Sequence, residues 1–265
     1  MTYCFRVPAA LRAPAIYGLM ALIVALVVES IPVSSQATNA PAKNQKAVPA
    51  PVDEARVARY EQLKSEAQDL LRARKFADAI RPGEAAFRLA EEIYGPGAIE
   101  AAIAAHNLGF ILRRADRGQD AQKYLELALK VYQARLPAVH EDIRNAIGEL
   151  GQIYLRNGRA EELVGLYREL IARAGREGHD RHIGNAHSHN NLGFVLRGAR
   201  RFQEAEEQWE RAVAIYAISA SPDDEPYRQA ADSLLNRYME QSQFDKARAL
   251  VVSTIERLRA LGKGQ

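Results

Sequence analysis

The stretches HNLGFILRR (residues 106–114) and HNNLGFVLRG (residues 189–198) are nearly identical, and their common LGF lies 84 positions apart. Half of that interval, 42 residues, separates Leu108, Leu150, Leu192 and Leu234. An apolar residue also recurs thirteen places after each leucine, at Ala121, Leu163, Ala205 and Ala247. Ala67, Leu70 and Ala79 continue the phase one period upstream, although Glu66 holds the place of the leucine. This period predicts an array of five units that stack on one another, the first of them degenerate.

Each unit contains two apolar patterns with the period of a helix. The first pattern in the second unit is Leu108, Ile111, Leu112 and Ala115, and the next is Ala121, Leu125, Ala128, Leu129 and Tyr132. Short breaker-rich links separate the patterns, as at residues 116–118 and 157–159. Each unit is therefore predicted to be a pair of antiparallel helices. Glycine costs a helix about 1 kcal/mol relative to alanine, so Gly109, Gly151 and Gly193 predict a close approach by another helix.

The segment NLGFVLRGARRFQEAEEQWERAVAIY (residues 191–216) resembles the tetratricopeptide repeat. The 42-residue spacing is similar to the longer subtype found in kinesin light chains and many bacterial proteins. The resemblance covers roughly residues 60–262, and it departs from the usual residues at Glu66, Gly83, Leu163, Leu235 and Thr254. It implies an all-α fold, a right-handed superhelical solenoid of about five antiparallel helix pairs. Such a fold implies binding of another protein or peptide.

The first 37 residues have the features of a secretory signal peptide. Arg6 and Arg12 precede an uncharged run from Ala13 to Val28, and Ser35 and Ala37 are small residues suited to a cleavage site. The run has sixteen residues, whereas a membrane span needs about 20. We therefore expect an exported protein, periplasmic or secreted. An uncleaved N-terminal anchor in the inner membrane is the alternative.

Residues 38–52 are rich in alanine, proline and lysine and are expected to form a disordered linker to the repeat domain at 53–265. Cleavage after residue 37 would remove Cys4, the only cysteine, and would leave 34 basic and 32 acidic side chains, a net charge of +2. This balance gives no reason to expect nucleic-acid binding. No membrane contact is expected beyond the possible N-terminal anchor.

The resemblance also assigns the ligand-facing positions, because the first helices of tetratricopeptide units line the concave face. Asparagine carries both a donor and an acceptor for a peptide backbone, and arginine binds carboxylates through two parallel hydrogen bonds. These positions predict a groove for an acidic segment or a C-terminal carboxylate; the alternative is that the arginines form solvated ion pairs. The predicted groove residues are Asn107, Phe110, Arg113, Arg114, Gln152, Arg156, Asn190, Asn191, Phe194 and Arg197.

The histidines in GHDRHIGNAHSH (residues 178–189) are the only pattern that suggests a metal. Ligands on a helix need a spacing of three or four residues, whereas His187 and His189 are two apart. His182 lies 42 residues after His140, which indicates a residue of the repeat linker. No phosphate loop, zinc motif or nucleophile elbow is present. We expect no catalytic residue, no metal and no cofactor, and we expect Trp209 to be a core residue.

The sequence therefore predicts a non-enzymatic scaffold or adaptor of the cell envelope that binds a partner segment in its groove. A peptide-sensing regulatory subunit that changes curvature on binding is the alternative, and a metal-dependent hydrolase is a third interpretation. The last predicted helix carries more apolar residues than one neighbour needs, which suggests self-association or a docked partner. These residues are Leu250, Val251, Val252, Ile255 and Leu258.

Overall fold

The computed structural model of the protein describes residues 53–219 and 224–262, and within them every regular element is an α-helix. The predicted signal peptide and linker lie outside the described residues. The helices are α1 (Glu54–Arg72), α2 (Phe76–Tyr94), α3 (Ile99–Arg114), α4 (Gly118–Arg135), α5 (Glu141–Arg156), α6 (Ala160–Arg176), α7 (Ile183–Gly198), α8 (Phe202–Ser219), α9 (Glu225–Glu240) and α10 (Phe244–Gly262).

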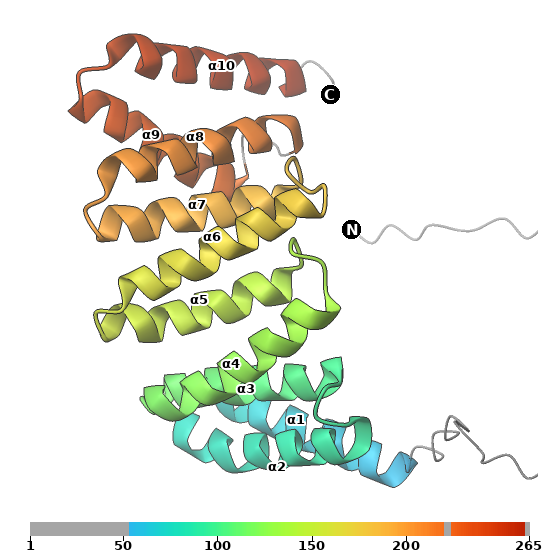
Figure 1. Cartoon of the computed structure of the whole chain (residues 1–265). Coiled ribbons are helices and arrows are strands. Elements are labelled where there is room, and N and C mark those ends of the chain that lie inside the picture. Colours follow the sequence, from blue (N-terminus) through green and yellow to red (C-terminus); the bar gives the residue numbers. More distant parts are fainter. Residues whose placement is uncertain (1–52, 220–223, 263–265) are drawn as a thin grey trace, which may run out of the picture. The chain divides into compact units, whose positions relative to one another are not determined.

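The helices stack in chain order as five pairs, from α1–α2 to α9–α10 (Figure 1). Between pairs, the second helix of one unit packs on the first helix of the next, as α2 does on α3 and α8 on α9. The predicted all-α array of about five helix pairs is confirmed. None of the helices in the described part of the chain is long and apolar enough to cross a membrane.

A three-residue link joins the two helices of every pair, and its middle residue always has a positive φ. The third residue of the link donates its N–H to a carbonyl five residues earlier, as Arg117 does to Leu112 at 2.8 Å. This hydrogen bond satisfies a carbonyl that the end of the helix would otherwise leave free. Only one of the five middle positions is a glycine. The five residues are Arg74 (57°), Asp116 (61°), Gly158 (70°), Arg200 (60°) and Ser242 (57°).

The glycine that follows the repeated leucine lies against the second helix of its own unit. A Cβ atom on Gly109 would lie 2.6 Å from Leu125 Cγ, and one on Gly193 would lie 2.5 Å from Trp209 Nε1. Trp209 is 2% exposed, as expected for a core residue. The predicted close approach of two helices at these glycines is therefore confirmed.

Two histidines begin first helices at equivalent positions of the repeat. His140 Nδ1 accepts the N–H of Asp142 at 3.3 Å, and His182 Nδ1 accepts the N–H of Gly184 at 3.0 Å. Each is the N-cap of its helix, α5 and α7 respectively, and satisfies a backbone donor that has no partner within the helix. The assignment of His182 to the repeat linker is confirmed, and its role is to cap a helix.

Candidate functional site

Two adjoining hollows lie along α5 and α7 and share Gly148 and Asn191 in their lining. We call them together the α5–α7 groove. The first hollow, of about 440 Å³, is polar and extends to α9; the second, of about 310 Å³, is more apolar and extends to α6. The polar hollow is lined by Arg144, Asn145, Gly148, Glu149, His187, Asn190, Asn191, Pro226 and Gln229. The apolar hollow is lined by Gly148, Gly151, Gln152, Leu155, Leu163, Tyr167, Asn191, Phe194 and Val195.

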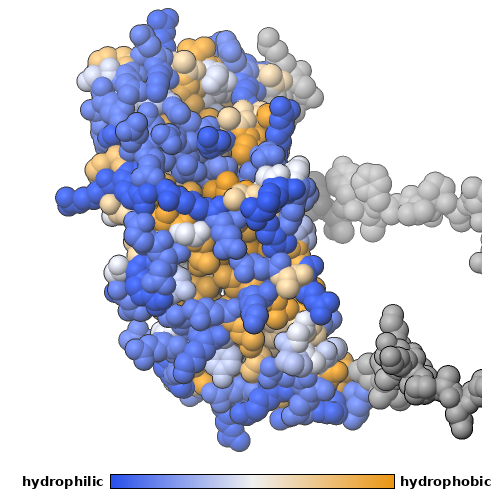
Figure 2. Space-filling view, viewed as in Figure 1, coloured by the Kyte–Doolittle hydropathy of each residue, from blue (hydrophilic) through white to orange (hydrophobic). Residues whose placement is uncertain are grey.

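The face in Figure 2 is mostly hydrophilic, with hydrophobic residues exposed in seams between the helices. The α5–α7 groove has a hydrophilic part next to a hydrophobic part, because amide side chains line one hollow while Leu155 and Phe194 line the other. Leu155 is 45% exposed, which leaves a large apolar side chain in contact with solvent. A groove of this kind offers hydrogen bonds and apolar contact to the same bound segment.

Arg144 is the cation of the polar hollow. Its guanidinium donates to the backbone carbonyl of Val139, and burial lowers the pKa of the group, an effect that the charge of Glu141 opposes. Within the described part of the chain, no carboxylate lies within ion-pair distance of Arg144. Arginine stays charged in proteins even when its pKa falls, so Arg144 places an unpaired positive charge in the hollow.

Two tyrosines and a histidine lie close enough to Arg144 to feel its charge. His187 Nδ1 lies 2.6 Å from the hydroxyl of Tyr216, and burial, together with Arg144 and His182, lowers the pKa of His187. Burial raises the pKa of Tyr167 to about 12, although a hydrogen bond with Asn191 and the charge of Arg144 oppose this shift. At neutral pH these three side chains are therefore uncharged, and they add no anion to balance Arg144.

Four predicted groove residues come together in the α5–α7 groove: Gln152, Asn190, Asn191 and Phe194. Gln152 is exposed, and Asn191 and Phe194 are half-buried. The Phe194 ring packs edge-on against Trp209 with 5.6 Å between centroids. Asn190 is only 3% exposed, and its Oδ1 atom has no hydrogen-bond partner. Asn190, which was predicted to face the ligand, is thus a buried side chain in the lining of the polar hollow.

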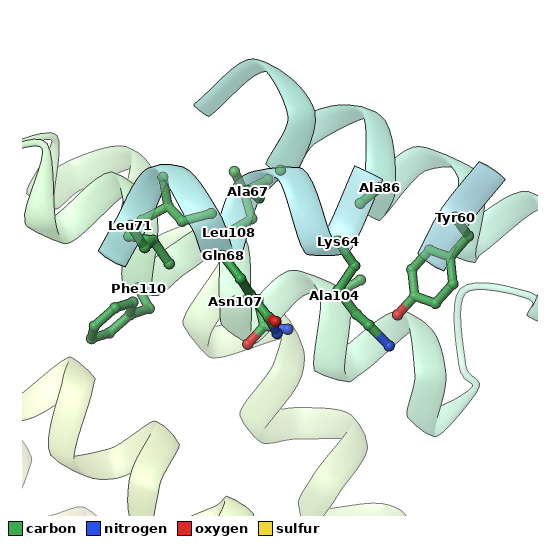
Figure 3. Close-up of a pocket in the computed structure, with 12 residues that line it drawn as sticks. Tyr60, Lys64, Ala67, Gln68, Leu71, Ala86, Ala104, Asn107, Leu108 and Phe110 are labelled. Carbon is green, nitrogen blue, oxygen red and sulfur yellow. The ribbon is translucent and has the colours of Figure 1, made fainter. Parts of the chain in front are cut away.

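Asn107 and Phe110 lie apart from this groove. They line a small apolar cavity of about 50 Å³ between α1, α2 and α3, with Tyr60 and Leu71 of α1 (Figure 3). Gln68 of α1 also lines this cavity. This cavity is too small for a peptide, so the structure separates these two residues from the other predicted ligand contacts.

The four predicted arginines have partners other than a ligand. Arg113 forms an ion pair with Glu149, with side chains 13% and 21% exposed, and Arg156 pairs with Asp116 at 3.2 Å. The Arg114 guanidinium lies over the ring of Phe76, 4.7 Å from its centroid. Arg197 lies over Phe194 at 5.7 Å. Arg156 thus forms a solvated ion pair, as in the alternative, whereas the ion pair of Arg113 is half-buried and Arg197 remains exposed beside the groove.

Sequence reasoning missed Arg144, Asn145, His187 and Gln229. Asn145, His187 and Gln229 all lie five residues before the repeated leucine of their unit. This row is one helical turn before the positions that were assigned to the ligand, so it belongs to the same face of each first helix. The helical periodicity of the sequence is the signal that could have identified this row of residues.

The remaining histidines make structural contacts. His189 Nδ1 lies 2.8 Å from Gln208 Oε1, and burial lowers the pKa of His189. His179 and His182 contact each other edge-on. Among the residues that the structure describes, no group of three possible ligands is arranged to hold a metal ion.

The fold and groove define an all-α repeat protein with an open surface for an extended ligand. Sequence comparison agrees with this class: the model of the tetratricopeptide repeat family matches residues 63–134 and 142–218, more than half of the chain. The protein belongs to the tetratricopeptide repeat family. Arrays of this family are protein–protein interaction scaffolds and are generally non-enzymatic. No curated protein compared with the chain is similar enough in sequence to count as a match.

Solved structures with the same fold include kinesin light chain-like repeats. BtubC (BKLC) from P. vanneervenii is 24% identical, with a TM-score of 0.61 over 81% of this chain and 89% of that one. Kinesin light chain TPR-like repeats from Podosopora anserina are 18% identical, with a TM-score of 0.55 over 77% and 95% of the two chains. A Rap protein complexed with Competence and Sporulation Factor is 18% identical, with a TM-score of 0.51 over 75% and 54%.

Proposed function

We propose that this protein is a non-enzymatic adaptor that binds an extended segment of another protein along the α5–α7 groove. The observation that carries the proposal is the pairing of two hollows on one face, one lined by amides and one by Leu155 and Phe194. Amides bind a peptide backbone whatever its sequence, and the apolar hollow accepts a hydrophobic side chain. The exposed Arg197 beside Phe194 favours a segment that carries acidic residues.

The proposed place of action is the cell envelope, after export directed by residues 1–37. The support is the pattern of the sequence, namely two arginines, an uncharged run and a small-residue site. The proposal includes a periplasmic or secreted adaptor and an adaptor anchored in the inner membrane. Fractionation of the native host with an antibody to the repeat domain distinguishes these locations, and a purely cytosolic protein contradicts all of them.

An array of random octapeptides, probed with the full chain, tests groove binding. Phe194→Ala is the test variant, and Phe202→Ala, which removes a phenylalanine that is 42% exposed on α8, is the matched control. The proposal expects binding by wild type and Phe202→Ala, and at least about tenfold weaker binding by Phe194→Ala. Helicity and melting temperature establish that each variant folds. Equal binding by both variants, or no binding by wild type, contradicts the proposal.

We also propose that α10 pairs with α10 of a second copy. Its exposed apolar residues Val251, Val252, Ile255 and Leu258 are 38–44% exposed. In the other units the first helix of the next unit covers this side, as Tyr227 of α9 packs on Tyr216 of α8 with ring centroids 6.4 Å apart. Among the described residues no helix does this for α10.

The outer face of α1 is a poor cover for α10. The repeat positions that Tyr227 and Ala230 hold in α9 are held in α1 by Arg59 and Gln62, which are polar and exposed. Head-to-tail stacking would therefore bury polar groups, whereas two α10 helices present apolar faces to each other and close into a dimer. Light scattering over a concentration series tests this. We expect the wild type to be a dimer. Ile255→Asp should dissociate this dimer, whereas Ser253→Asp, the control on the same helix, should leave it intact. A monomer at every concentration, or oligomers that grow with concentration, would refute the pairing of α10 helices.

A further inference from the structure

The small cavity between α1, α2 and α3, which we call the α1–α3 cavity, is lined by the same repeat positions as the apolar hollow of the α5–α7 groove. Adding 84, which is two repeat periods, to the residue numbers of the cavity gives eight of the nine residues that line the hollow. Four of these positions carry the same residue type at both places. In the cavity, shown in Figure 3, they are Gln68, Leu71, Asn107 and Phe110. The chain therefore forms one kind of recess twice, at the first and third junctions between units.

The second and fourth junctions do not repeat this chemistry. At the second junction, 42 residues after the cavity, the positions of Leu71 and Asn107 are held by Arg113 and Glu149, which form an ion pair with each other. The fourth junction again has an arginine, Arg197, at the position of the leucine. Units therefore stack without this recess, so its recurrence at every second junction is a feature that stacking alone does not require.

The α1–α3 cavity has the size of one aliphatic side chain. Gly83 lines it at the position where the larger Tyr167 lines the hollow, and a glycine within a helix costs about 1 kcal/mol relative to alanine. A cavity costs further stability, because the atoms around it lose dispersion contacts. One water-sized group needs about 10–15 Å³, so the 50 Å³ of the cavity holds about four such groups, as many as the heavy atoms of a leucine or isoleucine side chain.

We infer that the α1–α3 cavity is a second binding site of the same kind as the apolar hollow, and that the partner carries two tandem copies of a segment with an aliphatic residue, one copy for each site. Leu71 and Phe110 would contact the aliphatic side chain of one copy, as Leu155 and Phe194 would contact that of the other. Two linked copies bind about 10²–10⁴ times more tightly than one when the linker spans the sites, which gives the duplication a use. This inference rests on the groove binding proposed above and adds to it the architecture of the partner.

Titration calorimetry with the full chain tests the second site. The probe is the tightest-binding octapeptide of the array that contains leucine or isoleucine. We expect two molecules of it to bind each wild-type chain, and one to bind Phe110→Ala or Phe194→Ala, which remove the equivalent ring from one site or the other. The cavity, which is the smaller recess, should be the weaker site. Asn107→Ala, at an exposed position, should weaken binding at the cavity alone, and the matched control Phe202→Ala should keep both sites.

Tandem peptides test the architecture of the partner. They carry two copies of the octapeptide, joined by glycine–serine spacers of about 4 to 24 residues, which span roughly 10–30 Å on average. With the best spacer we expect the wild type to bind the tandem peptide about a hundredfold or more tighter than the single octapeptide. Phe110→Ala and Phe194→Ala should each lose this gain, because each leaves one site.

One octapeptide per wild-type chain, lost in Phe194→Ala and unchanged in Phe110→Ala and Asn107→Ala, overturns the second site and leaves groove binding intact. A tandem peptide that gains nothing at any spacer, or that gains equally on wild type and Phe110→Ala, overturns the tandem partner. The stoichiometry and the tandem gain are measured on the wild type, so a failure of Phe110→Ala to fold does not remove the test. No binding of any octapeptide to the wild type contradicts groove binding itself.

Discussion

Replacing Gly193 by alanine tests whether close helix packing positions the groove. Gly193 lies between Asn191 and Phe194 on α7, and a Cβ atom there would lie 2.5, 2.8 and 2.9 Å from Nε1, Cδ1 and Cε2 of Trp209. The indole is 2% exposed, so a displaced ring has to push against the packed side chains of the core. The helix gains about 1 kcal/mol from alanine, whereas overpacking costs about 1–3 kcal/mol. We therefore expect a net loss of up to about 2 kcal/mol in the free energy of unfolding.

Gly165→Ala is the matched control, because Gly165 lies within α6 and a Cβ atom there meets nothing within 4 Å. It should stabilise the protein by about 0.5–1 kcal/mol, so the two variants should differ by about 0.5–3 kcal/mol. Chemical denaturation followed by circular dichroism measures both. Adding Trp209→Phe to Gly193→Ala should recover part of the loss, and the indole N–H that it removes has no hydrogen-bond partner. Equal stabilisation by both alanines would refute the packing argument.

Three further predictions follow from the link, the ion pair and the buried histidines. Arg200→Gly should raise the free energy of unfolding by about 0.5–1 kcal/mol, because Arg200 has a φ of 60°; an unchanged or lower melting temperature contradicts this. Glu149→Gln should lower the free energy of unfolding by about 1–2 kcal/mol, because it leaves Arg113 unpaired in a half-buried place. The double variant with Arg113→Gln should recover part of this loss. Additive losses in a double-mutant cycle measured by denaturation would exclude the coupling. Burial lowers the pKa of three histidines, so the unfolded chain binds protons before the folded chain does as the pH falls below about 6.5. The free energy of unfolding should therefore fall as the pH falls, by up to about 1.4 kcal/mol per pH unit for each histidine. A urea midpoint that is constant from neutral to acidic pH would contradict the third prediction. The histidines are His106, His187 and His189.

The fold was predictable because the residues that recur in each repeat are those that pack between the helices. The 42-residue phase of Leu108, Leu150, Leu192 and Leu234 placed five helix pairs, and the glycine after the first three leucines predicted the close approach that Leu125 and Trp209 make. The αL residue of each link was not predictable from residue type, since arginine, aspartate and serine hold four of the five places. Position in the repeat, not propensity, decides the conformation there.

The site was only partly predictable, because ion pairs between units decide which charges are free. Arg113 meets Glu149 across 36 residues of sequence, and Arg156 meets Asp116 across 40. Separations slightly below one period bring neighbouring units into contact, so these partners are visible in the sequence only once the stacking is known. Asn191 and Phe194 line the hollows of the α5–α7 groove, whereas the burial of Asn190 depends on the packing of α7.

The most direct measurement is photo-crosslinking from inside the α5–α7 groove. A photoreactive amino acid replaces Gln152, an exposed groove residue, and in a control protein it replaces Glu169, an exposed residue of α6 that lines neither hollow. The probe is the octapeptide that binds best in the array. Groove binding predicts crosslinks at position 152 that unlabelled octapeptide competes away, and few at position 169. Equal labelling at both positions, or labelling at position 169 alone, contradicts it.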